Sequence, residues 1–154
     1  MKKALIIFTL LCSCGGPTLI HAQSANNKDN VLGTFDGRTP CQELAKQLSE
    51  PTIPECIKIK WRLTFYKNGL DTTSGTYSLE GFKFRGTNIL KGKWQMIKGT
   101  KADQNAIVYQ LNNPTKGSLY FLKADDNVLF FLDKEKNIMV GNRNFSYALY
   151  RIIE

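Results

Sequence analysis

Four cysteines are the residues of this chain best suited to chemistry, and their spacing divides them into two pairs. Cys12 and Cys14 fall in an apolar leader, whereas Cys41 and Cys56 lie 15 positions apart (56 − 41) in the body of the chain. In an oxidising compartment two thiols so spaced would form one disulfide, which would stabilise the fold by roughly 3 kcal/mol. Two alternatives stay open: a pair of thiolates for a soft metal such as Cu(I), or two unpaired thiols.

Residues for acid–base and nucleophilic catalysis are scarce. The single histidine, His21, precedes the body of the chain, which therefore has neither a Ser-His-Asp nor a Cys-His arrangement, and no imidazole ligand for zinc or copper. The only adjacent acidic pair, Asp125-Asp126, stands in a stretch typical of a turn. We therefore expect no enzyme and no catalytic residue. The only cofactor the sequence suggests is copper at Cys41 and Cys56.

Aromatic side chains offer a second candidate site, because barrels of about eight strands can just admit a small ligand. The five rings that could line such an apolar cavity are Trp61, Trp94, Tyr77, Tyr109 and Tyr147. The alternative is that these rings only fill a core.

The first residues have the pattern of a secretory signal: a basic end, an apolar run over Ala4–Leu11, and Ala22 at a cleavage position. Residues 1–22 are the predicted signal peptide. Alternatively, Leu11 to Cys14 resembles a bacterial lipobox, in which residues 1–13 are removed and Cys14 is lipidated. The run is too short to span a bilayer, so we expect no transmembrane helix and membrane contact only through such a lipid. Residues 23–30 then form a flexible tether, and residues 31–154 one folded domain.

The chain is basic, with 21 Lys and Arg against 13 Asp and Glu, a net charge of +8. Removal of the leader with Lys2 and Lys3 lowers this to +6 (8 − 2). The cations are spread along the chain and no nucleic-acid recognition motif is present, so nucleic acid is not expected as a partner. A basic protein outside the cytoplasm would instead be attracted to an anionic envelope surface, either lipid or polysaccharide.

Alternating apolar and polar side chains predict the strands that position the cysteines and the aromatic rings. Residues 57–66 alternate apolar and polar side chains without exception, which is typical of a strand with one solvated face. Less regular segments of the same kind are 31–35, 75–84, 88–97, 106–111, 118–123, 128–133, 138–141 and 145–152. Strands this short, joined by turn-forming residues, predict an all-β fold, a small antiparallel meander that closes into a barrel. Between Cys41 and Cys56 we expect one short helical or irregular insertion, a lid over one mouth.

Several motifs resemble one family. Gly33-Thr-Phe-Asp-Gly-Arg-Thr-Pro-Cys41, the strand that follows Cys56, Gly75-Thr-Tyr-Ser-Leu79, Gly92-Lys-Trp94 and Phe145-Ser-Tyr-Ala-Leu-Tyr-Arg151 together resemble the N-terminal domain of the copper-resistance lipoprotein NlpE. The resemblance implies a lipocalin-like barrel in the envelope of a Gram-negative bacterium, periplasmic or anchored to the outer membrane through Cys14. It further implies a binding role in copper homeostasis or the envelope-stress response, with an envelope component as partner.

The sequence departs from that family at the cysteines, which stand three apart in the family pattern. Here Gln42–Glu55 separates them, so the two thiols can meet at one ion only if the tertiary fold brings them together. The alternative function is a lipocalin-like carrier of a small apolar ligand.

Overall fold

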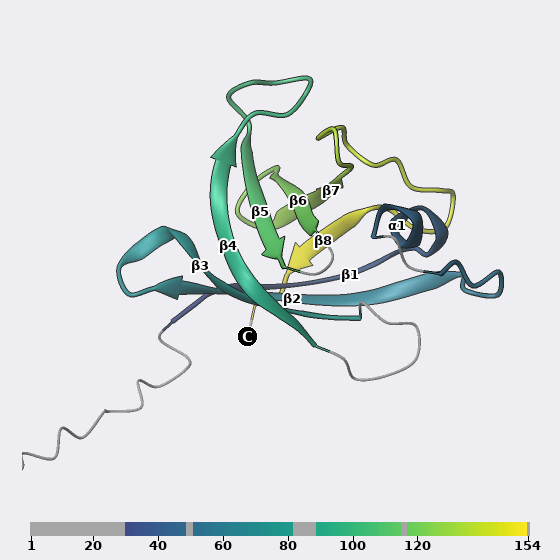
Figure 1. Ribbon diagram of the computed structural model, residues 1–154, viewed down its shortest axis with the longest axis horizontal. Coiled ribbons are helices and arrows are strands. Elements are labelled where there is room, and N and C mark those ends of the chain that lie inside the picture. Colours follow the sequence, from purple (N-terminus) through teal and green to yellow (C-terminus); the bar gives the residue numbers. More distant parts are fainter. Residues whose placement is uncertain (1–29, 49–50, 82–88, 115–116, 154) are drawn as a thin grey trace, which may run out of the picture.

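Within the residues that the computed structural model describes, namely 30–48, 51–81, 89–114 and 117–153, eight antiparallel strands form a closed barrel (Figure 1). Each strand pairs with the next along the chain, and the last returns to the first. The strands are β1 (Val31–Pro40), β2 (Lys58–Asn68), β3 (Asp71–Glu80), β4 (Leu90–Lys98), β5 (Ile107–Asn113), β6 (Gly117–Lys123), β7 (Val128–Leu132) and β8 (Ala148–Arg151); a helix, α1 (Gln42–Gln47), follows β1. The predicted all-β meander, its closure and its short helical insertion are confirmed.

Alternation explains why these segments are strands. In β2 the side chains of Ile59, Trp61, Leu63 and Phe65 are all buried, and the residues between them face outward. Because successive side chains of a strand point to opposite faces, this pattern directs one face of β2 into the barrel. The other strands repeat it, so a single core runs through the molecule.

Closure depends on a close approach of β8 to β1. Gly37 of β1 lies opposite Trp61 of β2 on one side and Leu149 of β8 on the other. A Cβ atom at Gly37 would collide with the backbone carbonyl of Ala148, so only glycine permits this spacing. Beyond the paired residues, the Ile152 amide donates to the Thr34 carbonyl at 2.8 Å and extends the seam.

Several predicted segments differ from the structure. β3 begins at Asp71 rather than at 75, β8 begins at Ala148 rather than at 145, and two further segments differ more. The first strand continues to Pro40 rather than ending at 35, because Asp36 and Arg38 lie on the outward face and the buried Thr39 accepts a hydrogen bond from Trp61, so the whole segment still pairs with β2. The predicted strand at 138–141 is wrong: Ile138 forms a single bridge to Leu132. The Phe131 amide donates to the Tyr147 carbonyl, because the chain that leads into β8 lies beside β7 at this point. Residues 138–141 therefore cannot pair with β7 along their length, and Val140 is 87% exposed.

The predicted leader, whether residues 1–22 or 1–13, and the predicted lipidation residue Cys14 lie outside the described residues. Of the predicted tether, 23–30, only Asn30 is described, and its carbonyl accepts from the Lys67 amide at 2.8 Å. Within the described ranges, no helix has both the length and the apolar character that crossing a bilayer requires.

Candidate functional site

Cys41 and Cys56 form a disulfide at one mouth of the barrel, with their Cα atoms 5.8 Å apart. Cys41 follows the last residue of β1 and precedes α1, and Cys56 stands two residues before β2, so the bridge ties the ends of two paired strands together. Leu44 and Leu48, one helical turn apart, are fully or almost fully buried in the core. The insertion therefore closes this mouth as a helical lid, and the Gln47 side-chain amide fastens it to the Leu132 carbonyl at 2.9 Å.

The donor set at this mouth does not fit a copper ion while the disulfide is intact, because a soft metal needs thiolates and both sulfurs are bonded to each other. No cluster of three His, Cys, Asp or Glu side chains occurs in the part of the chain that the structure describes. Met96 and Met139, whose thioether sulfurs are potential ligands for a soft metal, pack against the core. Copper binding by the two thiols would thus require prior reduction.

All five predicted cavity rings are buried in the barrel, and four of them make contacts with other aromatic rings, in two groups. Phe65 packs against Trp94 and Tyr109, with ring centroids 5.2 and 4.9 Å away. Phe131 packs likewise against Trp61 at 5.6 Å and Tyr147 at 6.4 Å. Tyr77 is 2% exposed and stacks over Gly92, where a Cβ atom would meet its ring. Four of the five rings therefore pack against other rings in the core, while Tyr77, Trp61 and Trp94 also border surface grooves.

Both tryptophans among these rings donate a hydrogen bond from the indole nitrogen. Trp61 donates from Nε1 to the Thr39 hydroxyl at 2.8 Å, and Trp94 donates to the Tyr66 carbonyl at 3.0 Å. Burial raises the pKa of Tyr77 and of Tyr109. The Tyr147 hydroxyl is buried without a partner in the described structure, and burial, followed by the charge of Glu43, raises the pKa of Tyr147 to about 12.

Asp125 and Asp126 lie in the turn between β6 and β7, as the sequence indicates. The Asp125 carboxylate accepts from the Asn127 amide at 2.7 Å and shapes the turn. Asp126 pairs with Lys123 at 2.7 Å, and this hydrogen bond lowers the pKa of Asp126 and raises that of Lys123. Both carboxylates thus have structural roles.

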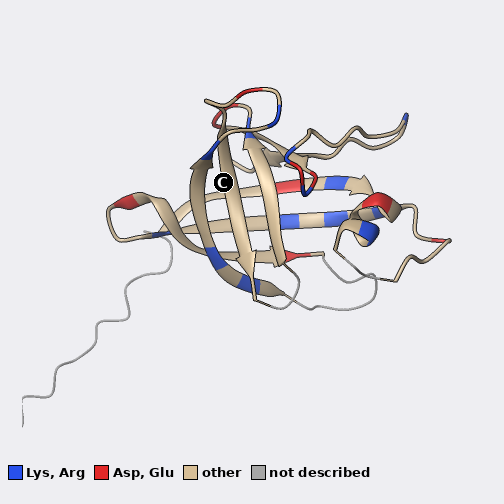
Figure 2. Cartoon of the chain, turned by 45° about the horizontal axis from the view of Figure 1, so that its top comes forward, with Lys and Arg blue, Asp and Glu red and all other residues tan. Residues whose placement is uncertain are grey.

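The outside of the barrel is divided into two halves by charge, a feature that the sequence reasoning missed. On β1–β4 the outward positions carry six basic residues against two acidic ones; they are Arg38, Lys58, Lys60, Arg62, Lys91 and Lys93 against Asp36 and Glu80 (Figure 2). On β5–β8 the outward positions hold Val108, Gln110, Asn112, Ser118, Tyr120, Leu122, Val128, Phe130, Leu132, Ala148 and Tyr150, none of them charged. The signal was present in residues 58–62, whose polar members are all cations.

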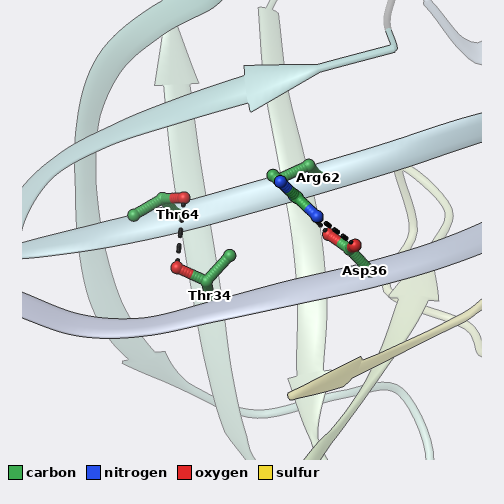
Figure 3. A network of polar contacts seen from close by, with 4 residues as sticks. All are labelled: Thr34, Asp36, Arg62 and Thr64. Atoms are coloured by element: carbon green, nitrogen blue, oxygen red, sulfur yellow. Dashed lines mark hydrogen bonds and ion pairs between the residues drawn. The ribbon is translucent and has the colours of Figure 1, made fainter. Parts of the chain in front are cut away.

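One transverse row of the cationic half holds two carboxylates and one guanidinium. Arg62 binds Asp36 through two hydrogen bonds of 2.9 and 2.7 Å (Figure 3), and its register neighbour on the other side is Glu80. Beside this row the hydroxyls of Thr34 and Thr64 approach to 3.3 Å across the same two strands (Figure 3). Bidentate geometry fixes the Asp36 carboxylate on Arg62.

Two surface grooves border that row. The first, of about 480 Å³, is lined by Asp36, Arg38 and Lys60 and by residues 144–146. The second, of about 760 Å³, is lined by Glu80 and by three lysines, Lys67, Lys91 and Lys93. These two grooves, and a third of about 460 Å³ lined by Lys67, Lys93 and Trp94 among others, are surface spaces in which the cationic half could hold a ligand.

Comparison with family models, with curated proteins and with solved structures finds no match to this chain. The class that the fold and the site define is a small antiparallel β-barrel with a disulfide-tied lid and a one-sided cationic surface. The resemblance to the N-terminal domain of NlpE stays a prediction.

Proposed function

We propose that this chain is a non-enzymatic binding protein of the Gram-negative cell envelope that acts in copper homeostasis or the envelope-stress response. The observation that carries the proposal is the Cys41–Cys56 disulfide. Structural disulfides persist in oxidising compartments such as the periplasm, and this one holds a lid on a barrel whose interior is filled by side chains. With the interior occupied, binding falls to the outer surface, where the charge is concentrated.

The alternative, a lipocalin-like carrier of a small apolar ligand, draws less support from the geometry. A carrier needs interior space, whereas Trp94, Tyr77 and Phe65 pack among themselves and their neighbours and are each at most 2% exposed. Native mass spectrometry of the protein purified from its own envelope separates the two: a co-purifying apolar molecule supports the carrier.

Growth of a strain that lacks the gene tests the proposed role. We expect altered tolerance to copper or to envelope-damaging agents, restored by the wild-type gene. Complementation with Cys41→Ser/Cys56→Ser reports whether the disulfide matters to the role. Unchanged tolerance to both classes of stress in the deletion strain would contradict the proposal.

The disulfide itself is open to a direct measurement. Removing a bridge that closes a loop of this length should cost about 3 kcal/mol in the free energy of unfolding, because the unfolded chain gains freedom. We expect urea unfolding of Cys41→Ser/Cys56→Ser to show that loss, and amide exchange in α1 to accelerate most. Alkylation of the unreduced, denatured wild type should label neither cysteine; labelling of both would show that the thiols are free.

A further inference from the structure

The first groove is lined by both cations and aromatic rings. Arg38 and Lys60 come from β1 and β2, and Asn144, Phe145 and Ser146 come from the segment that leads into β8. Tyr150 of β8, 55% exposed, also lines the groove. The groove thus combines positive charge, apolar ring surface and small hydrogen-bonding groups, a mixture typical of ligand sites.

The charge in this groove is uncompensated. Arg38 and Lys60 are direct cross-strand partners, an arrangement of like charges that destabilises a sheet. Lys58 adds a third cation, with its ammonium 5.6 Å from the centre of the Phe145 ring. Within the described ranges none of these three cations has a carboxylate partner, and the one carboxylate of the groove, Asp36, is held by Arg62. A bound anion would offset a repulsion that the fold otherwise bears.

The shape favours one kind of anion. A flat lipid surface would meet a convex face, whereas these cations line a concave groove beside a ring, an amide and a hydroxyl. A sugar acid matches that set: its carboxylate fits the Arg38 guanidinium and the Lys60 ammonium, its ring face fits Phe145, and its hydroxyls fit Asn144 and Ser146.

The second groove extends the match to a polymer. It lies on the same cationic half, across the Asp36–Arg62–Glu80 row, and repeats the combination of lysines with a tyrosine, Tyr66. Both grooves have a net positive lining, two cations against Asp36 in the first and three lysines against Glu80 in the second. Because a cleft with a charged lining concentrates ligands of the opposite sign, two such clefts on one face suit a chain that repeats its charged sugar.

We propose that the outer face of β1–β4 binds an acidic polysaccharide, with Arg38, Lys60 and Phe145 as the centre of the site. This inference rests on the proposed role of the chain as a binding protein and names its partner. It is tested by binding in vitro, which does not depend on any copper or stress phenotype. The polysaccharide inference can therefore fail while the proposed function stands, and the reverse.

The test uses the mature protein and calorimetric titration with three probes: oligogalacturonate, polyglutamate of equal charge and neutral dextran. We expect oligogalacturonate to bind at least tenfold more tightly than polyglutamate, longer oligomers to bind more tightly than shorter ones, and dextran not to bind. Affinity should fall as salt rises, because exposed charges are screened.

Matched variants locate the site. Arg38→Gln/Lys60→Gln should weaken oligogalacturonate binding at least tenfold. The control Lys98→Gln/Lys134→Gln, which removes the same charge from exposed positions outside both grooves, should change it less than twofold. Phe145→Leu keeps apolar bulk but loses the ring, so it should weaken binding of the sugar polymer and not that of polyglutamate. Unchanged thermal midpoints confirm that each variant is folded.

Three results would overturn the inference: equal affinity for polyglutamate, equal losses in the two double variants, or absence of binding to oligogalacturonate. Tighter binding to phosphatidylglycerol vesicles than to oligogalacturonate would also overturn it and would assign the face to a lipid surface.

Discussion

At the scale of single residues, polar atoms decide how firmly individual positions are held. The Tyr147 hydroxyl is buried and unpartnered in the described structure, whereas that of Tyr77 reaches the Asn112 carbonyl at 3.5 Å. A buried polar group without a hydrogen bond costs free energy, and one with a partner does not bear that cost. The substitution of each tyrosine by phenylalanine therefore compares the loss of an unbonded hydroxyl with the loss of a bonded one.

We expect Tyr147→Phe to leave the free energy of unfolding unchanged or to raise it by about 1 kcal/mol, because the substitution removes only the unpaired oxygen. Tyr77→Phe should lower it by about 1 kcal/mol, since a bonded carbonyl loses its donor. Urea unfolding of both variants measures the difference. A larger loss in Tyr147→Phe than in Tyr77→Phe would mean that the hydroxyl has a partner.

Asp71 makes the β2–β3 hairpin sensitive to acid. Its carboxylate accepts from the Thr73 amide at 2.7 Å and from the hydroxyls of Thr73 and Ser74 at 2.6 Å each. These bonds, the one from the Ser74 hydroxyl first, lower the pKa of Asp71 from 3.8 to about 2. Because the folded state favours the ionised form, the stabilisation is present above pH 4 and is lost as the pH falls towards 2.

The expected result is that the protection of the hairpin amides, measured relative to the intrinsic exchange rate at each pH, decreases between pH 4 and pH 2 in the wild type. In Asp71→Asn, which cannot ionise, the hairpin should be less protected at pH 5 and should change less across that window. Equal pH profiles for the two proteins would remove Asp71 as the cause.

At the scale of elements, the seam between β1 and β8 decides whether the barrel closes. Gly37 and Gly33 both lie on β1, but a Cβ atom at Gly37 meets the backbone of Ala148, whereas at Gly33 it meets only the flexible end of Arg151. Backbone cannot move aside as a long side chain can.

Gly37→Ala should therefore lower the free energy of unfolding by about 2–3 kcal/mol, and Gly33→Ala by clearly less. Thermal unfolding compares the two, and amide exchange of Leu149 in Gly37→Ala locates the damage. Similar losses at both positions would indicate that β8 can shift away from β1.

Local patterns explain which elements the sequence could predict. The unbroken alternation of residues 57–66 identified β2 almost to its ends, and Leu44 and Leu48 identified α1. Ile138 and Val140 alternate equally well but stay in a loop, because β8 occupies the edge of β7. That competition is tertiary and leaves no local trace. The grooves were unpredictable for the same reason: residues 144–146 meet Arg38 only through barrel closure.

At the scale of the whole molecule, the uncharged half of the barrel carries an outer apolar row. It crosses β4–β8 in register through Ile97, Val108, Leu122, Phe130 and Ala148. Val108 is fully buried although it lies outside the main core cluster. The barrel thus buries apolar surface on both sides of this part of its wall.

Val108→Thr, which keeps the side-chain shape but buries a hydroxyl, should lower the free energy of unfolding by about 1–2 kcal/mol. The neighbour Ile107 is 40% exposed, so Ile107→Thr should cost less than about 1 kcal/mol. Urea unfolding of the pair measures the contribution of the outer row. If the two losses match, Val108 contributes no more than an ordinary surface position.

Barrel closure also sets which way the lid faces. Near its start β1 pairs with the end of β8, where Phe35 lies opposite Arg151, whereas the lid follows Pro40 at the far end of β1 (Figure 1). Any segment that continues from either end of the barrel therefore departs from the rim remote from α1. An anchor attached there would hold the molecule with Cys41 and Cys56 turned towards the open compartment, within reach of a diffusing reductant and out of contact with the anchoring layer.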